Sequence, residues 1–410
     1  MLSMTRSSVT HLYSEAAART QPSAIREICK LIDSPSMKSL AGGWPDPRVF
    51  PDGRVSHIVE NLLATASDRV LQYGTTEGVR ELREELARRA AEQDGIHYDP
   101  DQILITHGSA QAMDLACRVF VNPSDVVMVG LPTYFGGTGT ITAHGGVSVG
   151  VPVDEGGLNV ELLGAKLEAL EGTGATVKAV YVIPNFQNPT GATLSLRRRR
   201  RLVELAEAHH LILLEDDPYG ELRFEGDPPP SLMALDTAGR VVHMRSMSKI
   251  FAPGLRLGWV AGDAGVIRKM SVAKQFTDVA TNSLAQYVLL EFVRRGFLDE
   301  SIARNRSHYR AKRDVMLQQL DLHFPKQVSW NHPSGGFFIF VRLPEGLDAR
   351  ELLDEALEHE VAFVAGGPFF VDGSSENSLR LSYAQASEED IEVAVGRLGR
   401  LLRRRLGLVD

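Results

Sequence analysis

One segment of the chain combines residue types suited to covalent chemistry at an amine. Lys249 follows the hydroxyls of Ser246 and Ser248, and Arg256 stands seven residues beyond the lysine. The apolar run Val241–Met244 just before them predicts a buried strand. A lysine at the end of such a strand can form a Schiff base with an aldehyde, while Ser246 and Arg256 can hold a phosphate. Pyridoxal phosphate needs both, a covalent anchor and an anion clamp. Taken alone, the segment also fits a surface lysine after a strand.

Two further features suit a flat, phosphorylated ligand. His107-Gly108-Ser109-Ala110-Gln111 follows the apolar run Ile103–Thr106 and opens a helical pattern. Free backbone N–H groups at a helix start attract a phosphate. Tyr134 follows the run Val126–Val129 and could stack on a heterocycle. The alternatives are an ordinary Gly-Ser turn and a packed loop tyrosine.

Three polar groups follow other strand-like runs. Asn188 precedes a proline, which favours extended backbone, and its amide can donate to a phenolate oxygen. Asp216 ends an apolar run, where a buried carboxylate needs a partner. A pyridine nitrogen would supply that partner and would stay protonated. Tyr219 can share the phenolate with Asn188. The alternatives are an Asn-Pro turn for Asn188, and a helix N-cap or a solvated acidic loop for Asp216.

These groups require a scaffold that brings strand ends together. Between about residues 100 and 262, short runs rich in Val, Ile and Leu alternate with helical patterns. Such runs are typical of parallel strands covered by helices on both faces. We therefore predict an α/β domain with a mostly parallel sheet, whose ligands bind beyond the carboxyl ends of the strands. The runs are Ile103–Thr106, Val126–Val129, Val177–Ile183, Leu211–Leu214, Val241–Met244 and Leu257–Ala261.

After about residue 300 the pattern changes and predicts a smaller α+β domain. We place an N-terminal arm and helix at residues 1–50, packed with the small domain. A large cofactor-binding domain then covers residues 51–298, and the small domain covers residues 299–410. The elements expected outside the large sheet are helices Ala24–Ile32, Tyr309–Leu322, Ala349–His359 and Glu388–Leu406, and strands Gly336–Val341 and Leu379–Ser382.

Composition argues against several other classes of protein. The net charge of −8 gives no general affinity for nucleic acid or for anionic membranes. The chain has no apolar run of about 18 residues, so the sequence predicts no membrane span. Cys29 and Cys117 suggest neither a metal site nor a disulfide framework. The polar N-terminus lacks the apolar stretch of a signal peptide, so we expect a cytoplasmic protein without a metal. The run Arg197–Arg201 indicates a solvated helix face with acidic neighbours.

Together these motifs resemble those of fold-type I pyridoxal-phosphate enzymes, specifically the class I aminotransferases. The subgroup that they resemble most contains the 2-aminoadipate transaminases and the aminotransferase-like half of the MocR regulators. The resemblance covers about residues 20 to 400 and implies the PLP-dependent transferase-like fold and a homodimer with shared active sites. The motifs are Ser23-Ala24-Ile25-Arg26-Glu27, Gly42-Gly43-Trp44-Pro45-Asp46-Pro47, Tyr73-Gly74, Gly108-Ser109, Asn188-Pro189-Thr190-Gly191, Asp216 with Tyr219, Ser246 to Arg256, Pro333-Ser334-Gly335-Gly336 and Leu379-Arg380-Leu381-Ser382-Tyr383.

The resemblance implies a role for each matching residue. Lys249 would form the Schiff base and later move the proton between Cα and C4′. Asp216 would pair with the pyridine nitrogen. Arg380 would hold the substrate α-carboxylate through two parallel hydrogen bonds, assisted by Asn188 and the backbone of Gly43. Among the other implied cofactor contacts, Asn188 and Tyr219 would bind the phenolate and Tyr134 would stack on the ring. The phosphate would be held by Ser109, the backbone of Ala110, Ser246 and Arg256, with Ser248 beside them. Tyr73 would reach the phosphate of the neighbouring subunit.

The chain departs from the family pattern at two positions. Trp44 replaces a smaller residue and would shape the pocket for the substrate side chain. Ala110 replaces the first of two glutamines, so that one side-chain contact is lost while the backbone donors remain. Arg26, on the N-terminal helix, could bind a distal substrate carboxylate. An exposed helix arginine is the alternative.

Three functions are compatible with a cofactor site of this kind. An aminotransferase would move an amino group between an L-amino acid and a 2-oxo acid by a ping-pong mechanism through Lys249, with glutamate and 2-oxoglutarate as one pair. Another reaction at the amino-acid Cα, by a lyase, decarboxylase or oxidase, is the alternative on the same fold. A MocR-type transcription factor would need a basic winged-helix domain, and about 20 residues before the first shared motif leave no room for one. We therefore expect an aminotransferase.

Overall fold

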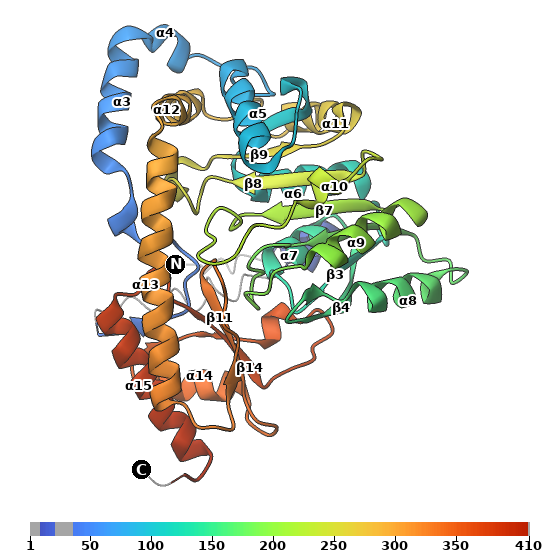
Figure 1. The fold of residues 1–410 in the computed structure, drawn as a ribbon. Helices are drawn as coiled ribbons and strands as arrows, with labels where there is room; N and C mark the ends of the chain where they lie inside the picture. The colour runs from blue at the N-terminus through green and yellow to red at the C-terminus, as the bar shows by residue number, and fades with distance from the viewer. Residues whose placement is uncertain (1–8, 21–35, 409–410) are drawn as a thin grey trace, which may run out of the picture.

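The central element of the fold is an eight-stranded sheet with helices on both sides (Figure 1). The computed structural model describes residues 9–20 and 36–408, so the helix expected at Ala24–Ile32 lies outside the described residues. In spatial order the strands are β2 (Ile103–Thr106), β9 (Gly258–Ala261), β8 (Val241–Ser246), β7 (Ile212–Asp217), β6 (Val177–Val182), β3 (Val126–Leu131), β4 (Val147–Asp154) and β5 (Gly157–Leu158).

Burial of both faces explains the apolar runs of the central strands. Within β7, Leu213 packs into the core on one face and Leu214 into the core on the other, because successive side chains of a strand point to opposite faces. Strands β4, β3, β6, β7 and β8 are parallel, and β9 is antiparallel to β2 and β8. The predicted α/β fold is confirmed. The covering helices are α6 (Gly108–Phe120), α7 (Phe135–Ala143) and α11 (Ala264–Gln275) on one face, and α8 (Val160–Leu170), α9 (Leu196–Ala208) and α10 (Leu232–Leu235) on the other.

Strand β4 is absent from our sequence prediction, and its place in the sheet explains why. It lies next to the short edge strand β5, and its first four residues are exposed or half-buried. Its sequence therefore alternates Val with Ser, Gly and Pro instead of forming a continuous apolar run.

A second sheet lies among the C-terminal elements, which are orange and red in Figure 1. The helices and strands expected after residue 330 are present, with bounds that differ by one or two residues. The antiparallel strands of this sheet, in order, are β10 (Ser329–Trp330), β11 (Phe338–Arg342), β14 (Ser378–Ser382) and β13 (Val364–Ala365), and the helices beside it are α14 (Ala349–Glu358) and α15 (Glu388–Arg405).

Helix α13 (Phe297–His323) connects the two parts of the molecule (Figure 1). It follows α12 (Ser283–Arg294) beside the large sheet and ends near α15. It begins twelve residues before the predicted start at Tyr309. The sequence pattern missed these first turns because they are rich in charged residues, and two of their four buried residues, Ser301 and Asn305, are polar. The expected domain boundary at 298/299 falls in the first turn of this helix.

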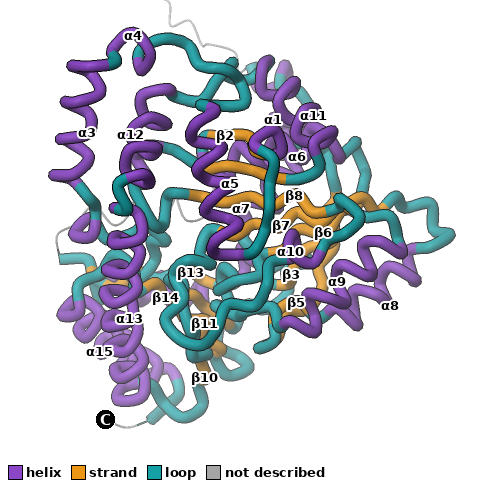
Figure 2. The backbone as a smooth tube through the Cα atoms, turned by 45° about the horizontal axis from the view of Figure 1, so that its top comes forward, coloured by secondary structure: helices purple, strands orange, loops and turns teal. Residues whose placement is uncertain are grey.

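The chain segment after residue 36 packs against the C-terminal elements. β1 (Lys38–Ser39) pairs in parallel with β12 (Val361–Ala362), and Lys38 forms a 2.5 Å ion pair with Asp390 of α15. In Figure 2 the orange strands of the large sheet lie at the centre, enclosed by purple helices. Within residues 9–20 and 36–408, no helix has the length and apolar character needed to cross a membrane.

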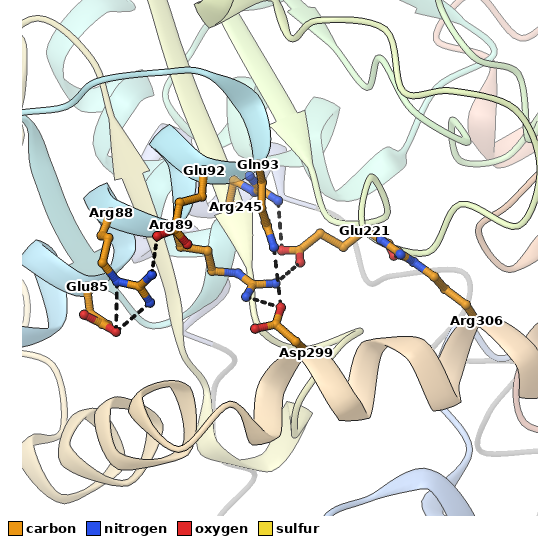
Figure 3. A network of polar contacts seen from close by, with 9 residues as sticks. All are labelled: Glu85, Arg88, Arg89, Glu92, Gln93, Glu221, Arg245, Asp299 and Arg306. Atoms are coloured by element: carbon orange, nitrogen blue, oxygen red, sulfur yellow. Dashed lines mark hydrogen bonds and ion pairs between the residues drawn. The ribbon is translucent and has the colours of Figure 1, made fainter.

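A largely buried network of charged side chains joins α5 (Arg80–Asp94), β8, the loop after β7 and α13 (Figure 3). Glu221 lies at its centre and pairs with Arg89 at 2.5 Å and with Arg245 at 2.9 Å. Arg89 also contacts Asp299, and Arg245 also contacts Asp94 at 2.8 Å. Burial alone would raise the pKa of Glu221, but the two arginines hold it below its ordinary value.

We expect Glu221→Gln to lower the free energy of unfolding at pH 7 by about 3–5 kcal/mol, because two buried guanidinium groups lose their shared carboxylate. Urea unfolding measures this. The stabilisation from a carboxylate with a lowered pKa is present above its unfolded pKa and is lost as the pH falls through the folded value. The difference between wild type and variant should therefore shrink on acidification.

Glu92→Gln is the matched control for that experiment. Glu92 pairs with Arg88 at 2.6 Å on the solvent side of the same helix, with 60% of its side chain exposed. Its loss should cost less than about 1 kcal/mol. Equal unfolding midpoints for the two variants would show that the buried network does not stabilise the fold.

Candidate active site

A cavity of about 300 Å³ lies where β6, β7 and β8 end. It brings together most of the site residues predicted from the sequence. These are Gly43, Trp44, Ser109, Ala110, Tyr134, Asn188, Asp216, Tyr219, Ser246, Ser248, Lys249, Arg256 and Arg380, and the further lining residues are Gly108, Phe135, Ile183, Pro218 and Phe338.

The Lys249 amine lies in this cavity. Its Nζ donates to the backbone oxygen of Gly43 at 2.9 Å. Burial lowers the pKa of Lys249 to about 8, and the charges of Arg380 and Arg256 act in the same direction, while Asp216 opposes them. At pH 7 about a tenth of the amine is therefore uncharged, far more than for an ordinary lysine, and the uncharged form is the one that attacks an aldehyde.

Asp216 is a buried carboxylate on the cavity wall. Its Oδ2 accepts from the Tyr181 hydroxyl at 2.9 Å, whereas its buried Oδ1 accepts no hydrogen bond from the described residues. Burial raises the pKa of Asp216 to about 6, although the hydroxyls of Tyr181 and Ser109 favour the charged form. A buried acceptor left without a donor costs about 1–3 kcal/mol. The free oxygen therefore fits the N–H of a protonated pyridine ring.

Tyr181 is a functional residue that we did not predict. It lies in β6, is almost fully buried, and orients Asp216 through its hydroxyl. The hydroxyl of Tyr181 within the apolar stretch Ala179–Ile183 was the available signal. Gly137 of α7 leaves room for the ring, because a Cβ there would lie 2.5 Å from Tyr181 Cε1.

The first turn of α6, which includes Ser109, forms an anion cradle with Arg256. Arg256 Nη2 donates to the backbone oxygen of His107 at 3.3 Å, and Nη1 donates to the hydroxyl of Ser248 at 3.4 Å. Gly108 has a φ of 75°, and a Cβ there would lie 3.0 Å from Arg256 Nη2, so this approach requires glycine. Helix N–H groups beside a guanidinium bind a phosphate well.

Arg380, at the centre of β14, is almost fully buried and reaches the cavity from the second sheet. Its Nη1 donates to Asn188 Oδ1 at 2.9 Å, and its Nη2 donates to the backbone oxygen of Ala41 at 2.6 Å. The guanidinium also lies over the ring of Phe338, with Cζ 4.1 Å from the ring centre. These contacts fix a planar cation suited to a carboxylate.

The arginine run Arg197–Arg201 differs from its prediction at one position. Arg197, Arg198 and Arg201 pair with acidic side chains, as predicted, but Arg199 is fully buried. It donates to the side chain of Asn185 and to the backbone oxygens of residues 184, 194 and 230. The helical repeat turns one residue per turn toward the sheet, and here that residue holds the loop that carries Asn188.

Aromatic side chains form much of the remaining wall. Tyr219 is buried and packs edge-on against Phe337 and Phe338, with ring centres 5.5 Å and 5.8 Å away. Burial raises the pKa of Tyr219 above its ordinary value, so its hydroxyl stays a donor at neutral pH. Trp44 lines the cavity with 48% of its surface exposed, and packs on Gly42.

Two predicted site residues are missing from the cavity lining that the described residues form. Tyr73 is 84% exposed and does not line it. Arg26 lies outside the described residues, so its predicted contact with a distal carboxylate is not placed. In the described part of the chain, no group of three or more His, Cys, Asp or Glu side chains could hold a metal ion.

The residues present fit pyridoxal phosphate at each of its functional groups. The amine of Lys249 suits the aldehyde, the unpaired oxygen of Asp216 suits the ring nitrogen, and the cradle at Gly108 and Arg256 suits the phosphate. Asn188 and Tyr219 supply donors between these points.

Comparison with known proteins agrees with this geometry. The family model described as aminotransferase class I and II matches residues 49–398. The chain is 40% identical to aromatic-amino-acid aminotransferase 1 of Thermococcus litoralis, over 96% of this chain and 94% of that protein.

Two solved structures are also similar over nearly their whole length. The kynurenine aminotransferase of Pyrococcus horikoshii, in complex with PMP, has a TM-score of 0.94 and 40% identity, covering 98% of this chain and 99% of that one. The α-aminoadipate aminotransferase LysN of Thermus thermophilus, complexed with N-(5'-phosphopyridoxyl)-L-leucine, has a TM-score of 0.89 and 37% identity, covering 98% and 100%.

We expect Asp216→Asn to weaken binding of pyridoxal phosphate and to slow amino-acid turnover by at least about a hundredfold, because a neutral amide cannot keep the ring nitrogen protonated. Absorbance titration of the apoprotein measures the first effect, and steady-state kinetics measures the second. Asp217→Asn is the control: it can still accept the hydrogen bond from the backbone N–H of Gly220 and should resemble wild type. The assignment fails if the effects of the two substitutions are reversed.

Proposed function

The chain belongs to the family of class I and II aminotransferases, and we propose that it moves an amino group between an L-amino acid and a 2-oxo acid by a ping-pong mechanism, with glutamate and 2-oxoglutarate as one pair. It is a pyridoxal-phosphate-dependent enzyme of fold type I. The observation that carries the proposal is the shared cavity of Lys249 and Arg380. An amine that can accept a proton then lies beside a buried guanidinium that can hold an α-carboxylate.

The protein groups divide the work. Bound pyridoxal phosphate supplies an aldehyde for amines and a ring that withdraws electrons from Cα. Lys249 Nζ anchors the cofactor and, once released, holds or moves the Cα proton, for which a pKa of about 8 is suitable. Asp216 keeps the ring nitrogen protonated. Arg380 binds and orients the carboxylate that amino acids and 2-oxo acids share.

The substrate side chain would lie toward Trp44, Phe135 and Ile183. This wall supports an aromatic or branched-chain amino acid as the second donor, beside glutamate. The relatives' names include aromatic-amino-acid, kynurenine and α-aminoadipate aminotransferases, which supports a broad choice. Binding of a distal carboxylate by Arg26 stays a prediction, as do the cytoplasmic location and the division into domains at residues 1–50, 51–298 and 299–410.

We also propose a homodimer with shared active sites. Large apolar side chains are exposed on two neighbouring loops, which are joined by a hydrogen bond from the Ser283 hydroxyl to the backbone oxygen of Gln72 at 3.0 Å. Exposed apolar surface of this kind supports an interface. Its members are Leu71, Tyr73, Phe276 and Val279, of which Tyr73 and Phe276 are 84% and 85% exposed.

The proposed reaction predicts a defined half-reaction. Holoenzyme mixed with L-glutamate alone should shift its visible absorption and release a single 2-oxoglutarate per site, and added 2-oxo acid should restore the spectrum. Lys249→Ala should show no turnover. Continuous release of ammonia or carbon dioxide when no 2-oxo acid has been added as acceptor would instead indicate the alternative reaction at Cα.

A shared site predicts complementation between inactive dimers. Tyr73→Phe and Lys249→Ala dimers, mixed and allowed to exchange subunits, should recover up to about a quarter of wild-type activity, because half of the dimers are mixed and each has one intact site. The control is a mixture of Lys249→Ala and Asp216→Asn dimers. It should recover no activity, since Lys249 and Asp216 line the same cavity of one subunit and each site of a mixed dimer therefore carries one of the two substitutions. Absence of recovery in the first mixture, with exchange verified, would contradict the role of Tyr73.

A further inference from the structure

The loop of residues 41–44 touches both ends of the reacting site. The backbone oxygen of Gly43 accepts from Lys249 Nζ at 2.9 Å, and that of Ala41 accepts from Arg380 Nη2 at 2.6 Å. Trp44, the next residue after Gly43, lines the same cavity. A displacement of this loop would therefore move both backbone oxygens, the one that binds the amine of Lys249 and the one that binds the guanidinium of Arg380.

Asp46, two residues beyond Trp44, fixes the far end of the loop. Its carboxylate is buried, with 2% of the side chain exposed. It accepts from Lys312 Nζ at 2.8 Å and from His308 Nε2 at 2.9 Å. It also accepts from the backbone and the guanidinium of Arg48, the shortest of these contacts being 2.6 Å. Its own backbone N–H donates to the Tyr309 hydroxyl at 3.0 Å.

Lys312, on α13, extends this anchor to the strand that carries Arg380. It is fully buried, and its Nζ also donates to the backbone oxygen of Ala384 at 2.6 Å. Ala384 follows β14, in which Arg380 lies. A buried ammonium group is costly unless it is paired. Here its two bonds join the loop after Trp44 to the end of β14.

We infer that Asp46 and Lys312 are positioning residues for the amino-transfer reaction, which hold Ala41, Gly43 and Arg380 in one arrangement for the substrate carboxylate. The inference rests on the proposed function, because it concerns binding of amino acids and 2-oxo acids at the same site. A purely structural ion pair would affect unfolding alone. A positioning pair also changes substrate affinity.

The test compares Asp46→Asn and Lys312→Met holoenzymes with wild type. We expect KM for the amino acid and for the 2-oxo acid to rise about 3- to 30-fold, the range found for residues that act through others, with a smaller change in kcat. Affinity for α-methylglutamate, which has the α-carboxylate but no Cα hydrogen, should weaken by the same factor in an absorbance titration. Hydrogen exchange of the peptide covering residues 40–46 should become faster.

Lys38→Met is the matched control. Its ion pair with Asp390 ties the same segment to α15, but on a side that does not line the cavity. It should leave KM and the α-methylglutamate affinity unchanged. Arg48→Ala is a second variant in case Asp46→Asn fails to fold, since Arg48 is 59% exposed. It should change KM in the same direction, but less.

The outcomes separate this inference from the proposed function. Suppose that the enzyme transfers amino groups and that Asp46→Asn has the same KM, α-methylglutamate affinity and loop exchange as wild type. That result would overturn the positioning role and leave the function intact. Wild type that transfers no amino group would overturn the function, and faster exchange at residues 40–46 in Asp46→Asn than in Lys38→Met would then still support the anchor. Equal exchange in those two variants would overturn it.

Discussion

The site depends on the burial of opposite charges at one edge of a parallel sheet. β7 and β8 pair so that Asp216 lies opposite Met244, and Lys249 follows in the turn beyond β8. Because both groups lie in a region with little water, burial raises the pKa of Asp216 and lowers that of Lys249. One physical cause thus gives a carboxylate that needs a cationic partner and an amine that is partly uncharged near neutral pH.

Loops around this edge are held by buried charged residues. Glu221 ties the loop after Tyr219 to β8 through Arg245. Arg199 binds the loop that carries Asn188. Asp46 fixes the segment that contains Gly43. In each case a charged side chain spans a gap between elements and satisfies groups that would otherwise be buried without partners. Their shared effect is to keep irregular backbone in place beside the cavity.

The second sheet completes the cavity. Arg380 of β14 and Phe338 of β11 face groups that come from the large sheet, and α13 connects the two parts. In the proposed reaction Arg380 offers the cation for the substrate carboxylate, while Trp44, Phe135 and Ile183 line the part of the cavity assigned to the substrate side chain.

The sequence by itself determined the parallel sheet and the residues at its strand ends, because burial on both faces leaves continuous apolar runs and because the chemistry after each run is local. It did not reveal β4, whose edge position permits polar residues. It also missed Tyr181, Asp46 and Lys312, since each gains its role from a partner distant in the chain. Only tertiary packing decided which of five consecutive arginines is buried. Arg199 is the one that α9 turns toward the loop before it, where its guanidinium finds hydrogen-bond acceptors.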